Sequence, residues 1–181
     1  MSWTIQPLPT EGPLFEGAIR VYAEAFARPP YRDSDRGGEV RQRMVEQHRA
    51  YPRFRSFCAL HSTGQVVGMT YGYHGARGQW WHDAVAAAFS VEQRAYWLRS
   101  SFELCEVAVA PAYQSFGIGR ALIGRLLEGC DEETCVLTSR VDSRASDLYL
   151  KLGFEHILRM RFFKDGHDFY VMGKRLKAPS G

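Results

Sequence analysis

The chain has 181 residues, of which 45% are hydrophobic and 24% are charged, a balance that excludes a disordered, collagen-like or coiled-coil chain. This length predicts one domain over residues 1–181, and the modest net charge of +3 argues against a dedicated nucleic-acid binder. The sequence contains neither a signal peptide nor an apolar run of the roughly 20 residues that cross a bilayer, so we expect a cytoplasmic protein without a membrane partner.

The first part of the chain is predicted to run strand, helix, helix, strand, strand. A short strand is expected over residues 3–8, and apolar residues at helical spacing predict a helix over 14–26. A second helix is expected to follow the glycine pair at 37–38. Two strand-like runs, over 54–62 and 65–73, are joined by a turn sequence and predict a hairpin.

A long insertion at 74–100 comes next, with a helix predicted over about 90–98. Insertions of this length are usually functional. The later elements are a buried strand, a helix, a strand, a helix and a final hairpin, over residues 104–110, 117–127, 135–139 and 143–152 and on either side of Asp165-Gly166. Ser143 is the expected N-cap of the last helix. The strand–helix–strand crossover implies parallel neighbours, so we predict an α/β fold with one mixed central sheet of about seven strands and helices on both faces.

A glycine-containing loop connects the buried strand to the helix that follows it. The loop consists of Gln114, Ser115, Phe116, Gly117, Ile118 and Gly119. Two glycines at a helix N-terminus leave backbone N–H groups open to phosphate oxygens. The loop lacks the Lys and Ser or Thr of a P-loop, and Leu122 stands where a dinucleotide fingerprint needs Gly or Ala. An anionic ligand of another kind is therefore expected.

The same loop resembles the acetyl-CoA signature of the GCN5-related N-acetyltransferase (GNAT) family: Gln or Arg, two residues, Gly, one residue, then Gly or Ala. Residues 114–119 match it position for position. The preceding VAVAP resembles the central strand of the family, and SRASDLYLKLGF at 143–154 resembles its helix leading to Gly-Phe. The resemblance implies the GNAT fold and an acyltransferase that uses acetyl-CoA as co-substrate. Asp142 departs from the Asn of many members, which weakens the case for a cofactor contact there.

The resemblance also assigns roles to individual residues. Those assigned to the cofactor are Val107, Ala108, Val109, Gln114, Ser115, Phe116, Gly117, Ile118, Gly119, Arg120 and Asp142. Pantetheine would pair with the strand backbone as an added strand, and the pyrophosphate would sit on the loop amides. Tyr149 matches the tyrosine that donates a proton to the departing CoA thiolate, although packing in the core is the alternative for this side chain.

Attack on a thioester needs a neutral amine, whereas a lysine-like amine has a pKa near ~10.4 and is protonated at pH 7. Glu106, a carboxylate within an apolar strand, is the candidate general base, and Glu103 is its rival. Glu106 could instead be a structural carboxylate paired with an arginine. The N–H of Val107 is the candidate donor to the oxyanion. Cys105 leaves a covalent intermediate open.

Aromatic residues gather in and before the insertion, where members of the family place the acceptor site. Tyr73, Trp80 and Trp81 are the candidate acceptor-binding residues, and the alternative for them is the core. His82-Asp83 is expected to have a surface or capping role rather than to act as an acid/base pair. The Arg-rich segment 28–55 is typical of a solvated helix face, with attraction of an anionic substrate or of RNA as the alternative. No metal-ligand spacing occurs, so no metal is expected.

The sequence therefore predicts an N-acetyltransferase that moves acetyl from acetyl-CoA to a primary amine of a small molecule, by direct attack with general-base assistance. A peptide or protein amine, at an N-terminus or a lysine, is the runner-up. A non-catalytic acyl-CoA sensor is the alternative from another class. Dimers are common in the family, so the resemblance allows a homodimer.

Overall fold

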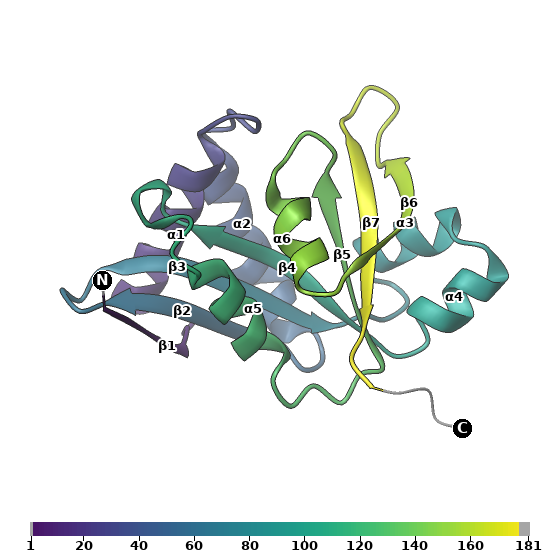
Figure 1. Cartoon of the computed structure of the whole chain (residues 1–181), viewed down its shortest axis with the longest axis horizontal. Coiled ribbons are helices and arrows are strands. Elements are labelled where there is room, and N and C mark those ends of the chain that lie inside the picture. The colour runs from purple at the N-terminus through teal and green to yellow at the C-terminus, as the bar shows by residue number, and fades with distance from the viewer. Residues whose placement is uncertain (1, 178–181) are drawn as a thin grey trace. The chain divides into compact units, whose positions relative to one another are not determined.

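The computed structural model describes residues 2–177 (Figure 1). The strands are β1 (Trp3–Pro7), β2 (Arg55–His61), β3 (Val66–His74), β4 (Ser101–Val109), β5 (Thr134–Arg140), β6 (Glu155–Arg161) and β7 (Asp168–Arg175). The helices are α1 (Gly12–Phe26), α2 (Arg36–Glu46), α3 (Trp80–Ala88), α4 (Val91–Trp97), α5 (Ile118–Leu127) and α6 (Ala145–Lys151), with 3₁₀ turns at His48–Ala50 and Pro111–Tyr113. The strands form one seven-stranded mixed sheet in the order β1-β2-β3-β4-β5-β7-β6. The predicted fold class is confirmed.

The chain divides into two compact units. The first comprises the residues up to Tyr73 together with Cys105–Gly129, and the second comprises His74–Leu104 together with the residues from Cys130 onward. Strand β4 contributes to both, because the division falls between Leu104 and Cys105. A single acetyltransferase domain over the whole chain stays a prediction.

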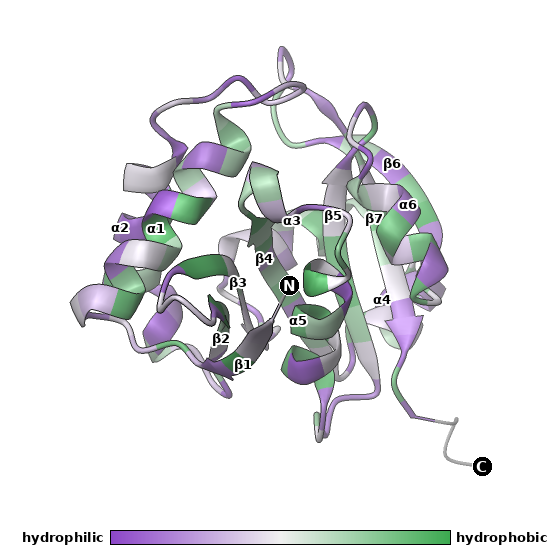
Figure 2. Ribbon diagram, turned by 60° about the vertical axis from the view of Figure 1, so that its left-hand side comes forward, coloured by the Kyte–Doolittle hydropathy of each residue, from purple (hydrophilic) through white to green (hydrophobic). Residues whose placement is uncertain are grey.

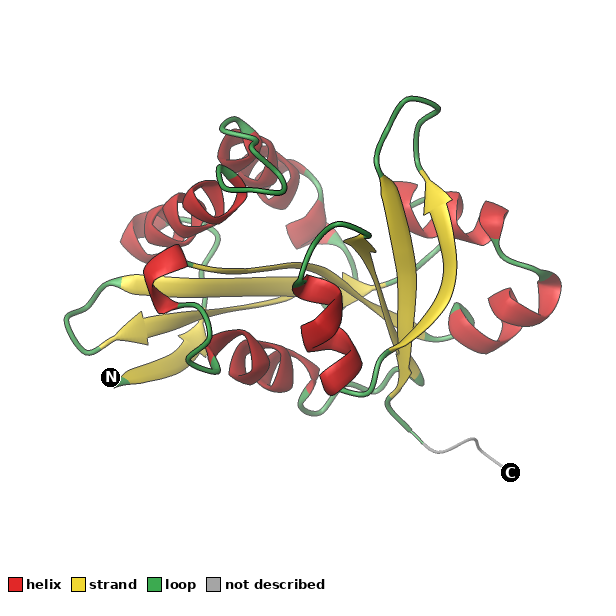
Figure 3. Ribbon diagram, turned by 45° about the horizontal axis from the view of Figure 1, so that its top comes forward, coloured by secondary structure: helices red, strands yellow, loops and turns green. Residues whose placement is uncertain are grey.

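In the first unit, helices cover both faces of the strands. Strand β2 pairs antiparallel with β1 and with β3, which confirms the predicted hairpin. Helices α1 and α2 lie on one side of these strands and α5 lies on the other (Figures 2 and 3). Gly68 of β3 makes room for α5, because a Cβ there would lie 2.9 Å from Leu122 and 3.0 Å from Ile118.

Helix α2 begins at Arg36, before the glycine pair and not after it, so that prediction was wrong. Gly37 is buried in the first turn, and a Cβ there would lie 2.8 Å from the Cβ of Ala23 in α1. The missing side chain allows the two helices to approach closely. The helix ends at Glu46, and His48 begins a separate 3₁₀ turn.

In the second unit, the insertion contains two helices where one was predicted. Helix α4 follows a capping box, in which the Ser90 side chain accepts from the Gln93 N–H. Helix α3 was missed because only His82 and Val85 of its nine residues are buried, which leaves a weak periodic signal.

The remaining strands of the second unit confirm the crossover and the final hairpin. Strands β4 and β5 are parallel and pair from Ser101–Thr134 to Glu103–Val136. Strand β7 pairs antiparallel with both β5 and β6. The β4–β5 ladder ends at Glu103, although β4 itself continues to Val109.

Helix α6 is shorter than predicted, and Arg144 occupies its N-cap position, so the assignment of Ser143 as N-cap was wrong. Ser143 precedes the cap residue and still serves the helix end, because its Oγ accepts a hydrogen bond from the Ala145 N–H at 3.1 Å. The short turn before α6 therefore satisfies a backbone donor without a side-chain bond from the cap residue itself.

Close packing around Gly173 of β7 predicts that a side chain at this position destabilises the protein. A Cβ there would lie 2.5 Å from the Trp97 ring and 2.8 Å from Ile157 Cδ1. Gly173→Ala is expected to lower the free energy of unfolding by about 1–3 kcal/mol, measured by urea denaturation. Gly124→Ala is the control, because nothing lies within 4 Å of a Cβ at that helical position, and it should raise stability by roughly 0.5–1 kcal/mol. Equal stability of the two variants would contradict the packing argument.

Candidate functional site

One edge of β4 in the first unit is directed away from β3. The Ala110 N–H donates to the Val67 carbonyl of β3 at 2.9 Å. Backbone groups alternate between the two edges along a strand, so those of Val107 and Val109 face the opposite edge. Within residues 2–177 the β4–β5 ladder does not reach these two residues. The edge can therefore accept an added extended chain.

The loop after β4 begins by closing back on that strand. The Gln114 side-chain amide donates from Nε2 to the carbonyl of Val109 at 3.1 Å. Ser115 and Gly117 both have positive φ, at 67° and 81°. Glycine tolerates this conformation without the steric cost that a Cβ brings. Through its bond to Val109, Gln114 holds the loop against the end of the strand.

Helix α5 starts directly from this loop, with Gly117 as its N-cap. The first amide to bond within the helix is that of Ala121, which donates to the Gly117 carbonyl at 3.0 Å. The N–H groups of Ile118, Gly119 and Arg120 therefore lie in the turn that has no intrahelical acceptor. The positive end of the helix dipole adds to them. Exposed glycine backbone and a neighbouring arginine fit a pyrophosphate.

Glu106 lies on β4 with its side chain only 11% exposed. Its Oε1 is 3.3 Å from Nη2 of Arg43 on α2. This is the arginine partner that the structural alternative for Glu106 requires. The ion pair also fixes the position of the carboxylate, so a structural role and a catalytic role both agree with the geometry.

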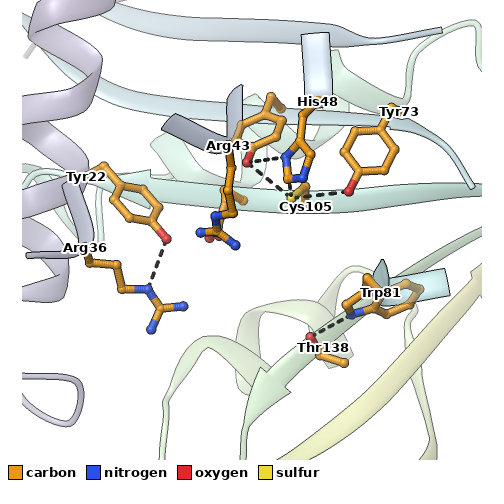
Figure 4. Close-up of polar contacts among 10 residues, drawn as sticks. Tyr22, Arg36, Arg43, His48, Tyr73, Trp81, Cys105 and Thr138 are labelled. Atoms are coloured by element: carbon orange, nitrogen blue, oxygen red, sulfur yellow. Dashed lines mark hydrogen bonds and ion pairs between the residues drawn. The ribbon is translucent and has the colours of Figure 1, made fainter. Parts of the chain in front are cut away.

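A buried polar cluster surrounds Cys105, the residue that precedes Glu106 on β4 (Figure 4). The Cys105 thiol donates to the Tyr71 hydroxyl at 3.3 Å, and this hydroxyl is 3.0 Å from His48 Nδ1. Burial raises the pKa of Tyr71 well above its ordinary value, so the phenol keeps its proton and shares a hydrogen bond with His48 Nδ1. The sequence did not indicate this position of His48, because Tyr71 and Cys105 lie far away from it along the chain.

The Tyr73 hydroxyl also reaches this cluster and contacts Cys105 Sγ at 3.8 Å. Its ring packs edge-on against Tyr51, with 4.9 Å between the ring centroids. Tyr73 is 2% exposed. The structure therefore places this predicted acceptor-binding residue in the core of the first unit.

His48 predicts a pH-dependent stability. Burial, with a further contribution from Arg43, lowers the pKa of His48 from 6.5 to about 4. The unfolded state therefore takes up the proton first as the pH falls. About 3 kcal/mol of stability is present above pH 6.5 and is lost progressively towards pH 4. Urea denaturation between pH 7.5 and 4.5 should show a steeper loss in the wild type than in His48→Gln. Parallel pH dependences would contradict this.

In the second unit, Tyr149 lies on α6 and is 6% exposed. Its ring packs edge-on against Phe154, with 5.7 Å between the ring centroids. Glu103, the rival base, belongs to this unit and is also buried. The Asp142 carboxylate accepts two hydrogen bonds from Arg140, at 3.0 and 2.6 Å, and this bonding lowers its pKa. Asp142 therefore already has a cationic partner.

The two candidate tryptophans differ in their surroundings. Trp80 is 59% exposed, and its ring lies 5.1 Å from that of Phe162. Trp81 is partly buried, and its Nε1 donates to Thr138 Oγ1 at 3.2 Å (Figure 4). Asp83 accepts from the Gly78 N–H at 3.0 Å in the turn before α3, whose N-cap residue Gln79 makes no side-chain capping bond.

Within residues 2–177, no helix is long and apolar enough to cross a membrane. The same residues contain no group of three or more His, Cys, Asp or Glu side chains that could hold a metal ion.

The model of the acetyltransferase (GNAT) domain matches residues 79–176. This chain belongs to the GNAT acetyltransferase family. A GCN5-like protein acetyltransferase of Mycobacterium tuberculosis is 38% identical over 125 residues, which cover 64% of this chain and 61% of that protein. The N-alpha-acetyltransferase RimI of the same organism is 37% identical over 82 residues, which cover 44% of this chain and 52% of that protein. The chain thus spans less than two thirds of either relative.

Among solved structures, a histone acetyltransferase HPA2 and related acetyltransferase from Corynebacterium glutamicum has a TM-score of 0.69 and 22% identity, with both chains fully covered. This likeness shows the fold alone. The family match confirms the resemblance that the loop and strand predicted, and it assigns the chain to a family whose co-substrate is acetyl-CoA.

Proposed function

We propose that this chain transfers the acetyl group of acetyl-CoA to a primary amine. The observation that carries the proposal is the continuity of β4 with its loop. The outward edge at Val107 and Val109 leads into a glycine turn and then into three helix-terminal amides that lack helical acceptors. Consecutive parts of one unit thus offer hydrogen-bond partners to an extended amide chain and to a pyrophosphate.

The cofactor contacts follow from this arrangement. Val107 and Val109 would pair with pantetheine through their outward backbone groups, with Ala108 lying between them, and the loop from Gln114 to Gly119 would hold the pyrophosphate on its amides. Arg120 would add a positive charge. Asp142 is less suited to a cofactor contact, because its carboxylate is already engaged by Arg140.

The proposed transfer begins when Glu106 accepts a proton from the acceptor amine, while the Arg43 ion pair keeps the carboxylate in place. The amine nitrogen bonds to the acetyl carbon, and the bond from that carbon to the CoA sulfur breaks. The Val107 N–H would stabilise the oxyanion. Tyr149 would give its proton to the departing thiolate.

The role of Tyr149 predicts the effect of removing only its hydroxyl. Tyr149→Phe keeps the ring that packs against Phe154 and is expected to lower kcat by about 10²-fold, the lower end of the range for proton transfer. Thiol release measured over a pH series checks this prediction. Unchanged kcat in a folded variant would leave Tyr149 with a packing role only.

The relatives bear on the kind of acceptor. One is named a protein acetyltransferase and another an N-alpha-acetyltransferase, and both names favour a protein amine over the small molecule that the sequence predicted. A small-molecule amine is the second candidate, favoured by the exposed indole of Trp80, which offers an apolar surface.

An acceptor panel tests the proposal. Peptides with a free N-terminus, N-terminally blocked peptides with one lysine, and small amines are each incubated with acetyl-CoA, and released thiol and product mass are measured. Amine-dependent release with an acetylated product is expected, and the productive group identifies the acceptor. Release with no member of the panel, by a folded chain that binds acetyl-CoA, would overturn the proposal in favour of a non-catalytic acyl-CoA sensor.

A further inference from the structure

Figure 4 shows two arginines of α2 in the first unit, Arg36 and Arg43. Arg43 forms an ion pair with the Glu106 carboxylate. Arg36, at the start of the helix, is near enough for its charge to interact with both Glu106 and Arg43. Within residues 2–177, no carboxylate forms an ion pair with Arg36. The second cation beside the proposed base is therefore not used by the fold as an ion-pair partner.

The Arg36 side chain is nevertheless held in place. Its guanidinium carbon lies 4.5 Å from the ring centroid of Phe26 and 5.8 Å from that of Tyr31. Its Nε donates to the Tyr22 hydroxyl at 3.3 Å. These contacts involve the faces of the aromatic rings and the Nε donor of Arg36. They leave its two terminal amino groups available, and these two groups form the fork that binds a carboxylate with two hydrogen bonds.

The charges around Glu106 favour an anion. Burial raises the pKa of Tyr22 well above its ordinary value, so that side chain is neutral. His48, with a pKa of about 4, is neutral at pH 7. Of the two guanidinium groups, that of Arg43 pairs with the Glu106 carboxylate, whereas among the described residues no carboxylate forms an ion pair with Arg36. The charge of Arg36 disfavours a plain cationic amine and favours an amine that carries its own negative group.

Acidic residues precede Arg36 in the chain, but they are engaged locally. The Asp33 carboxylate accepts from the Asp35 N–H at 3.2 Å, and Asp35 Oδ1 is the acceptor for the Ser34 hydroxyl at 3.4 Å. Among the described residues, neither forms an ion pair with Arg36. These two carboxylates therefore leave the Arg36 guanidinium available for a carboxylate from outside the chain.

We propose that Arg36 binds a carboxylate that the acceptor carries close to its amine, so that the substrate class is an acidic or zwitterionic amine. This inference rests on the proposed acetyl transfer with Glu106 as base. The carboxylate could belong to an acidic residue near the N-terminus of a peptide or to a free amino acid, and both sources present the same group to Arg36.

Matched acceptors test the inference. Peptides that differ only by Asp against Asn, or Glu against Gln, in their first two residues are compared by kcat/KM, and a free amino acid is compared with its amide. The wild type is expected to prefer the acid by about 10- to 100-fold, as a charged hydrogen bond allows. The productive pair identifies the source of the carboxylate.

Variants of α2 complete the test. Arg36→Gln should bring the acid-to-amide ratio of kcat/KM close to one, and Arg36→Lys should restore part of the preference. Arg41→Gln is the matched control, because Arg41 lies on the same helix and pairs with Glu16, and it should keep the wild-type ratio. Thermal unfolding verifies that each variant is folded.

The two proposals fail in different ways. Wild-type protein that uses amides as well as acids would overturn the carboxylate inference and leave acetyl transfer standing. If no amine is turned over, acetyl transfer fails, and titration of the same acid and amide pairs into CoA-saturated protein decides the role of Arg36. Equal affinity for the two members of a pair would overturn that role, and a preference for the acid that Arg36→Gln abolishes would support it.

Discussion

In the Glu106→Gln variant, kcat for acetyl transfer is expected to fall by about 10²- to 10⁴-fold, the range that general-base catalysis contributes. Glutamine keeps the shape of the side chain on β4 and removes the group that takes the proton from the amine. The affinity for acetyl-CoA should stay at the wild-type value, because the proposed cofactor contacts are backbone groups of Val107, Val109 and the loop. Thiol release at saturating acetyl-CoA measures the first effect, and calorimetry measures the second.

Two further variants distinguish a catalytic role of Glu106 from a structural one. Arg43→Gln removes the ion-pair partner of Glu106 and retains the carboxylate, so it should lower kcat less than Glu106→Gln does. Glu103→Gln tests the rival base. Full activity of Glu106→Gln together with a large loss in Glu103→Gln would move the base to Glu103 and leave Glu106 with the structural role in its ion pair.

Replacement of Gly117 by glutamate is expected to weaken acetyl-CoA binding by at least about 10²-fold. The new carboxylate would stand at the helix N-terminus proposed for the pyrophosphate and would oppose its charge. The backbone φ of +81° also disfavours any side chain here, at roughly 1–2 kcal/mol. Calorimetric titration of acetyl-CoA gives the change in Kd.

Gly117→Ala isolates the charge effect from the backbone effect. Nothing lies within 4 Å of a Cβ at this position, so alanine adds strain without a clash. The proposed site predicts that the Gly117→Ala variant binds acetyl-CoA much more tightly than the Gly117→Glu variant does. Equal affinities for the two variants would show that the pyrophosphate does not approach Gly117.

The parts of the fold that local sequence determines could be predicted. The strand, the glycine loop and α5 follow one another without a break, and their spacing alone indicated a phosphate site. The glycine pair at 37–38 was misread because its place inside α2 depends on packing against Ala23, a contact between separate helices. Helix α3 was missed for a related reason, since it buries too few residues to produce a stripe.

The candidate site was predictable in its backbone and less so in its side chains. Glu106 was expected to have either a catalytic role or an arginine partner, but the sequence could not identify which of the many arginines of segment 28–55 would reach it. The contact to Arg43 joins residues of α2 and β4 that lie 63 positions apart in the chain. The chain of hydrogen bonds from Cys105 through Tyr71 to His48 likewise joins three separate elements, and no spacing of residues in the sequence predicts it.

Residue-resolved amide exchange, with and without acetyl-CoA, tests the central claim most directly. The account predicts that acetyl-CoA protects the amides of Val107 and Val109 on the outward edge of β4, together with those of Ile118, Gly119 and Arg120 at the start of α5. The Ala110 amide, which already donates to Val67, should change little and serves as the internal control. Saturating acetyl-CoA that leaves the exchange of these five amides unchanged would contradict the account.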